Sequence, residues 1–523
     1  MKSFLKIHQE SITGVLSGWD RLMFRGTTRM ISSVRGMRAY MAQQGILLKD
    51  FVAWSTGVTK SLRDASESVA REAGRPIMYL SGAAQSKEEI AREIAQRDGI
   101  TSGLICVLES VDPCMSFDIR GNRREKKLEL VARERKCMWL YHYMIHPIVG
   151  FMHARLQTWA PFTVKVCING REWLSRSLDK KGLGYVRRDN CFVDLADIGR
   201  TQQISDGLLR TDWPRLLDSF QRTISPGHRT VFADYPLDYY WSADESEWAT
   251  DIMFKDPALL AKLYPGLIRH GLTVFDSREV MRFLGAKTPA QHGINGNFKG
   301  EVVTHLGRRP EGVRIKHRHN LNSVKMYDKQ GSVLRVETTI NNTREFKVYR
   351  RPNDDPRRDM TWQKMRKGVA DLHRRATVSH ACNKRYLDAL AAVRPGLTLH
   401  DAFNPLCRRA TIRNKPVRPL NLWGDDDAKL LTAVCRGEFT INGFRNKDIL
   451  PLLFDNPPAK GTLQRKRLSA RVTRKLALLR AHGIIQKIPK TSRYALTDNG
   501  QRITAVLAIA RDTDTNDLLK MAA

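Results

Sequence analysis

Four side chains that could act together on a phosphate group lie within one stretch, Arg314–Tyr349. Lys325 and Tyr327 occupy alternate positions of SVKMYD, and Arg335 and Glu337 occupy alternate positions of VLRVETTI. Alternate residues of a strand share a face, so these four emerge together if the apolar residues pack on the opposite face. A tyrosine, two cations and a carboxylate on rigid strands could perform nucleophilic phosphate chemistry. Lys325, Tyr327 and Glu337 are therefore our candidate catalytic residues, with ordinary cross-strand pairing as the alternative.

A tight connection between two strands must position these side chains. The two apolar sets face the same side only if the connection holds an odd number of residues. The segment between the strands is Lys329-Gln330-Gly331-Ser332, and its glycine can adopt positive φ. We therefore predict a hairpin with a connection of about three residues, centred on Gly331.

A second group of candidate residues consists of carboxylates in the segment ESEWATD, which contains Glu245, Glu247 and Asp251. In a strand, two or three of these carboxylates would share one face. Clustered carboxylates repel each other unless a cation lies among them, and Mg²⁺ or Mn²⁺ is commonly held by such oxygens. We predict Glu247, Asp251 and Glu337 as metal ligands, and salt bridges to this basic chain are the alternative.

The sequence K-M-Y-D-K followed by R-V-E resembles the R-x-Y-(N/D)-K … R-x-E pattern of rolling-circle plasmid replication initiators. In that family the tyrosine is the DNA-nicking nucleophile, and nearby acidic residues bind a divalent metal. The resemblance covers about twenty residues. It implies that Tyr327 is the nucleophile, that Glu337 is a metal ligand, and that Lys329 matches the lysine after the tyrosine.

Composition restricts the class of partner. The chain has 523 residues, 42% of them hydrophobic, and a net charge of +34 with an isoelectric point near 10.1. The length predicts two to four domains, and the apolar content excludes a disordered chain. A cationic excess of this size, spread over the whole chain, favours nucleic acid as the partner. No apolar run reaches the length of a membrane span.

Several motif classes are missing from the sequence. It contains neither GxxxxGK[ST] nor a GxGxxG that opens a helix, which disfavours an ATPase or a dinucleotide-dependent enzyme. The eight cysteines form no C-x-x-C pair, which disfavours a zinc ribbon and is typical of a reduced, cytoplasmic protein.

Aromatic and basic residues are mixed in the block 137–190. On a helix His142 and His146 would share a face and could hold a metal, but structural histidines are the stronger expectation. The aromatic side chains could stack on the bases of a single strand, or they could be core residues with cations at the rim. The sequence leaves both interpretations open.

The C-terminal segment 425–512 predicts a helix, a short strand, two helices, a β-hairpin and a final helix. Leu468, Val472, Leu476 and Leu479 form one apolar stripe of the third helix, and Gly483 is positioned to end it. Residues 456–497 contain eleven Lys or Arg and no Asp or Glu. A merely solvated helical face would mix charges of both signs.

This order of elements resembles that of bacterial winged-helix DNA-binding domains. The resemblance implies that the third helix enters a major groove and that the hairpin contacts phosphates or the minor groove. The residues predicted to bind nucleic acid are cations of this helix and of the hairpin tip: Arg465, Lys466, Arg467, Arg471, Arg474, Lys475, Lys490 and Arg493.

We therefore predict a multidomain α+β protein. Its parts are an N-terminal α/β region (1–200), a central antiparallel-sheet domain (201–395), a linker (396–424) and a winged-helix domain (425–523). The function predicted first is DNA binding by a protein of a bacterial mobile element or replication system, with metal-dependent nicking in the central domain. A non-catalytic regulator or origin-binding protein and an RNA-binding protein are the alternatives.

Overall fold

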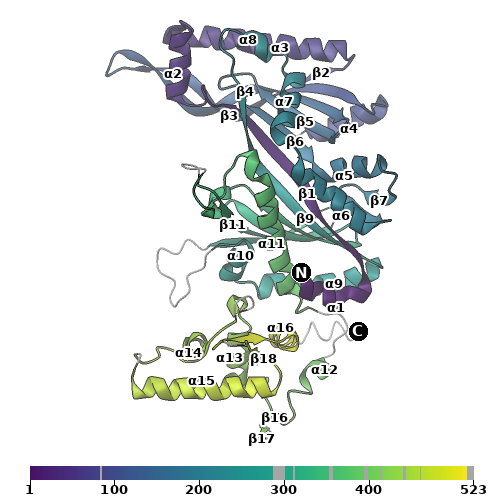
Figure 1. Ribbon diagram of the computed structural model, residues 1–523, viewed down its shortest axis with the longest axis vertical. Helices are drawn as coiled ribbons and strands as arrows, with labels where there is room; N and C mark the ends of the chain where they lie inside the picture. The colour runs from purple at the N-terminus through teal and green to yellow at the C-terminus, as the bar shows by residue number, and fades with distance from the viewer. Residues whose placement is uncertain are drawn as a thin grey trace. The chain divides into compact units, whose positions relative to one another are not determined.

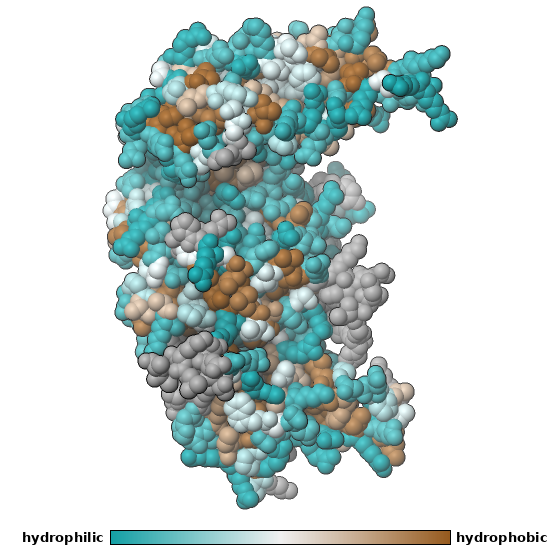
Figure 2. All heavy atoms as spheres, turned by 180° about the vertical axis from the view of Figure 1, so that it is seen from behind, coloured by the Kyte–Doolittle hydropathy of each residue, from teal (hydrophilic) through white to brown (hydrophobic). Residues whose placement is uncertain are grey.

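The computed structural model describes residues 1–82, 85–286, 301–309, 312–352, 357–393, 399–412, 415–439, 443–459, 461–489 and 491–514. These residues form helices and strands with one large mixed sheet and four two-stranded sheets (Figure 1), which confirms the predicted α+β class. Over that described part, no helix combines the length and the apolar character needed to cross a membrane. Hydrophilic residues predominate on the face drawn in Figure 2, and hydrophobic ones form separate patches.

The chain divides into two compact units, and neither is one continuous segment. Unit 1 consists of Met1–Val15, Asp251–Thr338 and Ala381–Ala523, and unit 2 consists of Leu16–Thr250 and Thr339–His380. All four divisions fall inside regular elements, whereas the domain boundaries predicted from sequence fall at presumed loops. A boundary is recognised in a sequence by linker composition, and the interior of a strand or helix has none.

Unit 2 contains the strand order β9-β1-β6-β5-β4-β3-β2, in which β2 runs parallel to β3 and β3, β4, β5, β6 and β1 pair antiparallel in turn. The strands are β1 (Ile12–Thr28), β2 (Ile77–Leu80), β3 (Gly103–Asn122), β4 (Lys127–His146), β5 (Gly150–Gln157), β6 (Val164–Asn169) and β9 (Tyr239–Phe254). Two further pairs are β7 (Tyr185–Arg188) with β8 (Cys191–Leu195) and β14 (Lys347–Arg350) with β15 (Thr361–Lys364).

Helices pack on this sheet through apolar faces with helical spacing. In α3, for example, Phe51, Val58 and Leu62 are buried in the same core as Trp19 and Phe24 of β1. The helices are α2 (Val34–Gln43), α3 (Phe51–Glu72), α4 (Lys87–Arg97), α5 (Gly170–Asp179), α6 (Ile198–Gly207), α7 (Trp213–Ile224) and α8 (Gly227–Val231).

In unit 1, strands β10, β11, β12 and β13 lie in that order, followed by the end of β9. Their apolar residues, including Ile315, Val324 and Val336, share a core with Leu260 of α9 and Tyr386 of α11. The elements are α1 (Lys2–His8), α9 (Pro257–Thr273), α10 (Ser277–Phe283), β10 (Val302–Arg309), β11 (Gly312–His319), β12 (Asn322–Lys329), β13 (Val333–Ile340) and α11 (Leu372–Leu390).

The C-terminal part of unit 1 has its own apolar core. The predicted linker 396–424 contributes to that core, because Leu406, Leu420 and Leu422 are buried in it. Its elements are α12 (Leu399–Phe403), β16 (Ala410–Ile412), β17 (Lys415–Val417), α13 (Asp425–Val434), α14 (Asn446–Leu453), α15 (Leu463–Ala481), β18 (Ile485–Lys487), β19 (Tyr494–Leu496) and α16 (Asp498–Asp512). A short strand was predicted between the first two helices; between α13 and α14 the described residues include the 3-10 helix Gly437–Phe439, and residues 440–442 lie outside the described part.

The predicted stripe and stop of α15 are confirmed. Val472, Leu476 and Leu479 are buried, and Gly483 has a φ of +68° directly after the helix. Its amide donates to the Arg480 carbonyl at 3.1 Å, which satisfies a carbonyl of the last turn.

Candidate functional site

The central hairpin has the predicted connection. Strand β12 ends at Lys329 and β13 begins at Val333, so three residues join them. Gly331 is the middle one, with a φ of +72°, and Gln330 also has a positive φ of +58°. The odd length places the alternating sets of both strands on common faces, as expected.

One of these faces carries a closed polar cluster of the predicted catalytic residues. The Lys325 ammonium donates to Glu337 Oε1 at 2.6 Å, and the Tyr327 hydroxyl donates to Glu337 Oε2 at 2.7 Å. The three side chains therefore do meet, but they are not presented to solvent. Glu337 is 1% exposed and Tyr327 is 8% exposed, and all eight residues of β13 are buried. Alternation in the sequence indicated a shared face but not that this face is covered too.

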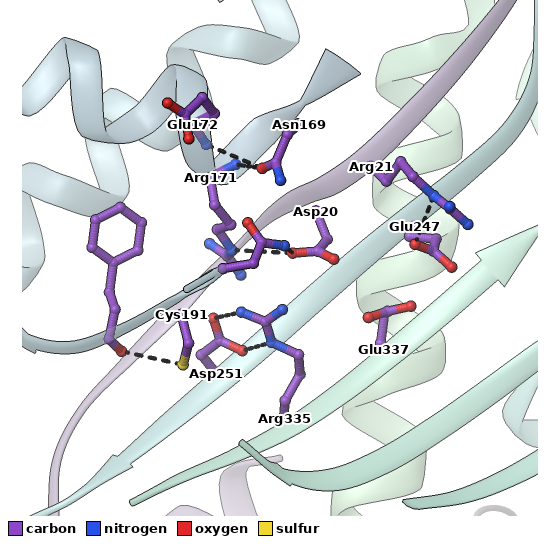
Figure 3. Close-up of polar contacts among 12 residues, drawn as sticks. Asp20, Arg21, Asn169, Arg171, Glu172, Cys191, Glu247, Asp251, Arg335 and Glu337 are labelled. Carbon is purple, nitrogen blue, oxygen red and sulfur yellow. Dashed lines mark hydrogen bonds and ion pairs between the residues drawn. The ribbon is translucent and has the colours of Figure 1, made fainter. Parts of the chain in front are cut away.

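The fourth residue, Arg335, forms a bidentate ion pair with Asp251 of β9 (Figure 3). Its Nε lies 2.5 Å from Asp251 Oδ1 and its Nη2 lies 2.9 Å from Asp251 Oδ2. Both residues are almost completely buried. Metal binding by Asp251, as predicted from sequence, would require this pair to break, because both carboxylate oxygens already accept from the guanidinium.

The electrostatics of the hairpin favour the charged form of Glu337. Burial by itself would raise the pKa of this carboxyl group, but the charge and hydrogen bond of Lys325, with the Tyr327 hydroxyl, lower the pKa to about 2. A carboxylate with such a low pKa is a weak base towards a phenol. In this arrangement the cluster stabilises the hairpin more than it activates Tyr327.

The remaining predicted metal ligand, Glu247, belongs to unit 2. Arg21 forms an ion pair with Glu247 (Figure 3), and its Nε atom lies 3.1 Å from Glu247 Oε2. Asp20 was missed in the sequence, although its carboxylate lies within 4.8 Å of that of Glu247, and both residues are buried. Two carboxylates at this separation have the donor chemistry for Mg²⁺ or Mn²⁺. In the sequence, Asp20 stands out only as the one acidic residue in the segment that forms β1.

Asp20 also has cationic and amide neighbours. Asn190 Nδ2 donates to its Oδ1 atom at 2.8 Å, and Arg171 Nε lies 3.8 Å from the same oxygen. Ion pairing, the alternative weighed for the acidic segment, is therefore present at Glu247 and at Asp251, and Asp20 has a cationic neighbour as well.

The first part of the aromatic block, from residue 137 to residue 169, lies mainly in strands β4, β5 and β6, and helix α5 follows it. His142 and His146 lie on β4, so their spacing of four residues is not a helical one. His142 is completely buried, and burial lowers its pKa to about 4, which is typical of a neutral structural histidine. Trp139 and Tyr141 are buried as well. These residues are core aromatics and do not form a stacking surface.

The predicted nucleic-acid contacts of α15 lie on its outer side. Arg467, Arg471 and Arg474 are exposed and are spaced four and three residues apart, which places them along one side of the helix, away from the buried stripe. Lys466 is also exposed, and Arg465 is partly exposed. Lys490 lies outside the described residues.

The acidic start of α13 contacts two of these cations. The Asp426 carboxylate lies 3.4 Å from Arg471 Nη2 and 3.3 Å from Lys475 Nζ. A shallow groove runs beside them, lined also by Arg418 and Arg474. At the hairpin, Arg493 Nη1 donates to the Gly443 carbonyl at 3.1 Å.

Comparisons with protein-family models, with curated proteins and with solved structures find no match for this chain.

Proposed function

We propose that the protein binds nucleic acid, and duplex DNA first, through the C-terminal part of unit 1. The observation that carries this proposal is the line of Arg467, Arg471 and Arg474 along the solvent side of α15. Three guanidinium groups on one side of a helix form a charged ridge that suits the phosphates flanking a major groove. A net charge of +34 for the chain supports the same class of partner.

The proposed fold of this part is a winged helix. Asn446, the first residue of α14, forms hydrogen bonds with α15. Its Nδ2 atom donates to the Ser469 carbonyl at 2.9 Å and to Thr473 Oγ1 at 2.8 Å. Strands β18 and β19 form a hairpin directly after α15, in the position of a wing. In this proposal α15 is the recognition helix and the hairpin tip contacts the DNA backbone.

The pairs with Asp426 do not oppose this role. Its side chain is 75% exposed, and ion pairs at such exposed positions contribute little to stability. DNA phosphates can therefore replace Asp426 as the partner of Arg471, which is 50% exposed, at small cost, whereas Lys475 is only 11% exposed.

The salt dependence of binding tests the proposal. Each phosphate neutralised on duplex DNA contributes about 0.9 to the slope of log affinity against log salt. The double variant Arg471→Ala/Arg474→Ala should therefore flatten the slope by about two units. Arg123→Ala/Arg124→Ala, which removes two exposed cations of unit 2, is the matched control and should leave the slope for a short duplex unchanged. An unchanged slope in the α15 variant would contradict the proposal.

The second candidate function is nicking of DNA by Tyr327. The observation that favours it is the 2.7 Å hydrogen bond to Glu337, which holds the phenolic oxygen in a fixed position. Glu337 could accept the phenolic proton only after release from Lys325, since that cation lowers its pKa. Such a reaction requires the hairpin to open, because Tyr327 is buried. Mg²⁺ or Mn²⁺ remains a proposed cofactor of the chain, and Glu247 and Asp20 of unit 2 are its candidate ligands.

Supercoiled plasmid with Mg²⁺ or Mn²⁺ tests the nicking activity. A covalent protein–DNA adduct that disappears in Tyr327→Phe would support the tyrosine mechanism. Cutting that survives Tyr327→Phe and disappears in Glu247→Ala would indicate a metal-activated water instead. Binding without cutting would favour a non-catalytic regulator or origin-binding protein, and preference for RNA over duplex DNA would favour the RNA-binding alternative.

A further inference from the structure

A small hairpin in unit 2 exposes two aromatic rings next to each other. Strands β14 and β15 pair antiparallel, with Tyr349 directly opposite Trp362. The ring centroids are 5.9 Å apart. Tyr349 is 53% exposed, and Trp362, at 66%, is the most exposed large hydrophobic side chain in the described part of the chain. Large aromatic side chains are normally buried or paired, so this exposure needs an explanation.

The same face carries two lysines in unfavourable register. Lys347 lies directly opposite Lys364, next to the aromatic pair, and both side chains are exposed. Like charges directly opposite each other destabilise a strand pair. Among the residues that the structure describes, no carboxylate lies within ion-pair distance of either lysine. The exposed face of this hairpin is therefore cationic as well as aromatic.

The opposite face of the hairpin is fixed to unit 2. Val348 packs with Ile340, Phe346 and Met365 in a small apolar cluster. Arg350 is buried, and its Nη2 atom donates to the Lys364 carbonyl at 2.9 Å. The exposed rings are thus held on a rigid support and lose little conformational freedom when they bind a ligand.

We propose that the exposed face of β14 and β15 binds single-stranded nucleic acid. Bases stack on Tyr349 and Trp362, and the phosphates between them lie near Lys347 and Lys364. Adjacent aromatic rings flanked by cations are the chemistry by which proteins hold unpaired bases without reading their sequence. Duplex DNA does not fit this surface, because its bases are already stacked on one another.

The inference does not depend on duplex binding by α15, since it concerns different residues in a different unit. To separate the two, binding is measured in the Arg471→Ala/Arg474→Ala background of the full chain. The probes are labelled oligo(dT) and oligo(U) of about 20 nucleotides, long enough to cover a single site. Fluorescence anisotropy gives the dissociation constants, and the two probes distinguish DNA from RNA.

Trp362→Ala should weaken oligonucleotide binding by about tenfold, because stacking of one base on an aromatic ring corresponds to roughly 5- to 150-fold in affinity. Trp362→Phe, which keeps a ring, should retain most of the affinity. The matched control is Tyr79→Ala, since Tyr79 is 57% exposed in the same unit but is not part of the hairpin. That variant should bind as the parent protein does.

The lysines supply a second, independent measurement. Each phosphate contact on a single strand contributes about 0.7 to the salt slope, so Lys347→Gln/Lys364→Gln should flatten it by about 1.4. Oligonucleotide affinity that is unchanged in Trp362→Ala would overturn the proposal. So would equal losses in Trp362→Phe and Trp362→Ala, or self-association of the chain that Trp362→Ala abolishes while oligonucleotide binding persists. Failure of the parent chain to bind duplex DNA, with oligonucleotide binding intact, would overturn only the role of α15.

Discussion

Two hairpins of this chain carry the same residue types in opposite surroundings. In β12–β13, Lys325 and Tyr327 both bind one buried carboxylate, Glu337. In β14–β15, Lys347 and Tyr349 are likewise two residues apart on one strand, but both are exposed. A lysine and a tyrosine in a strand therefore have no fixed role.

The difference follows from the cost of burial. A buried ammonium group needs a charged partner, because the loss of hydration is otherwise too expensive. Glu337 supplies that partner in the first hairpin, whose charges are consequently occupied. Within the described residues the second hairpin has no such carboxylate, so its charge and its rings are available to a ligand. The predictions below change a charge or a hydroxyl group in one hairpin or in both.

The largest expected effect is on stability when the buried pair is broken. Glu337→Gln leaves the Lys325 ammonium without its charged partner and should lower the free energy of unfolding by about 3–5 kcal/mol. Lys364→Gln in the exposed hairpin should change it by less than about 0.5 kcal/mol. Denaturant unfolding of the full chain measures both. Lys325→Met added to Glu337→Gln should recover part of the loss, and a further loss in that double variant would contradict the pairing.

The pH dependence of stability should also depend on Glu337. Folding lowers the pKa of this group from 4.5 to about 2, so its contribution is complete above pH 4.5 and disappears as the pH falls towards 2. The stability difference between the wild-type chain and Glu337→Gln should therefore shrink over that interval. Denaturant midpoints measured at each pH check it. A constant difference down to pH 2 would show that the carboxylate is not held by cations.

Removal of one hydroxyl from each hairpin gives a smaller effect. Tyr327→Phe removes the buried hydrogen bond to Glu337 and should cost about 1.5–3 kcal/mol, as expected for a bond to a charged group. Tyr349→Phe removes an exposed hydroxyl and should be neutral, and it should also preserve oligonucleotide binding because the ring remains. Thermal unfolding midpoints compare the two variants. Equal effects would mean that Tyr327 is not buried in solution.

The smallest expected effect on stability comes from a change of charge in the exposed hairpin. Lys364→Glu replaces a repulsion opposite Lys347 with an attraction and should stabilise the hairpin by about 0.2–1 kcal/mol. The same variant should weaken binding of oligo(dT), because it places a negative charge beside the proposed phosphate position. A gain in stability in unfolding measurements together with a loss of oligo(dT) affinity in anisotropy measurements would support the proposed role. Stability and affinity that both rise or both fall would contradict it.

Much of the local structure was predictable from the sequence. The alternation in SVKMYD and VLRVETTI, with Gly331 between them, predicted the strands, the connection of three residues and the common face of Lys325, Tyr327 and Glu337. The apolar stripe of α15 and its end at Gly483 were predicted in the same way. These features depend on local periodicity and on the conformational freedom of glycine, which neighbouring residues alone decide.

The environment of those same residues was decided only by the tertiary structure. Alternation shows which side chains share a face, but a second layer decides whether that face meets water, and its residues come from distant parts of the chain. Asp251 is 84 residues before its partner Arg335, and no local pattern connects them. For the same reason the aromatic block from residue 137 became core, whereas Tyr349 and Trp362 remained exposed. The local sequence determines which side chains share a face of a strand, and long-range packing determines whether that face is exposed to a ligand.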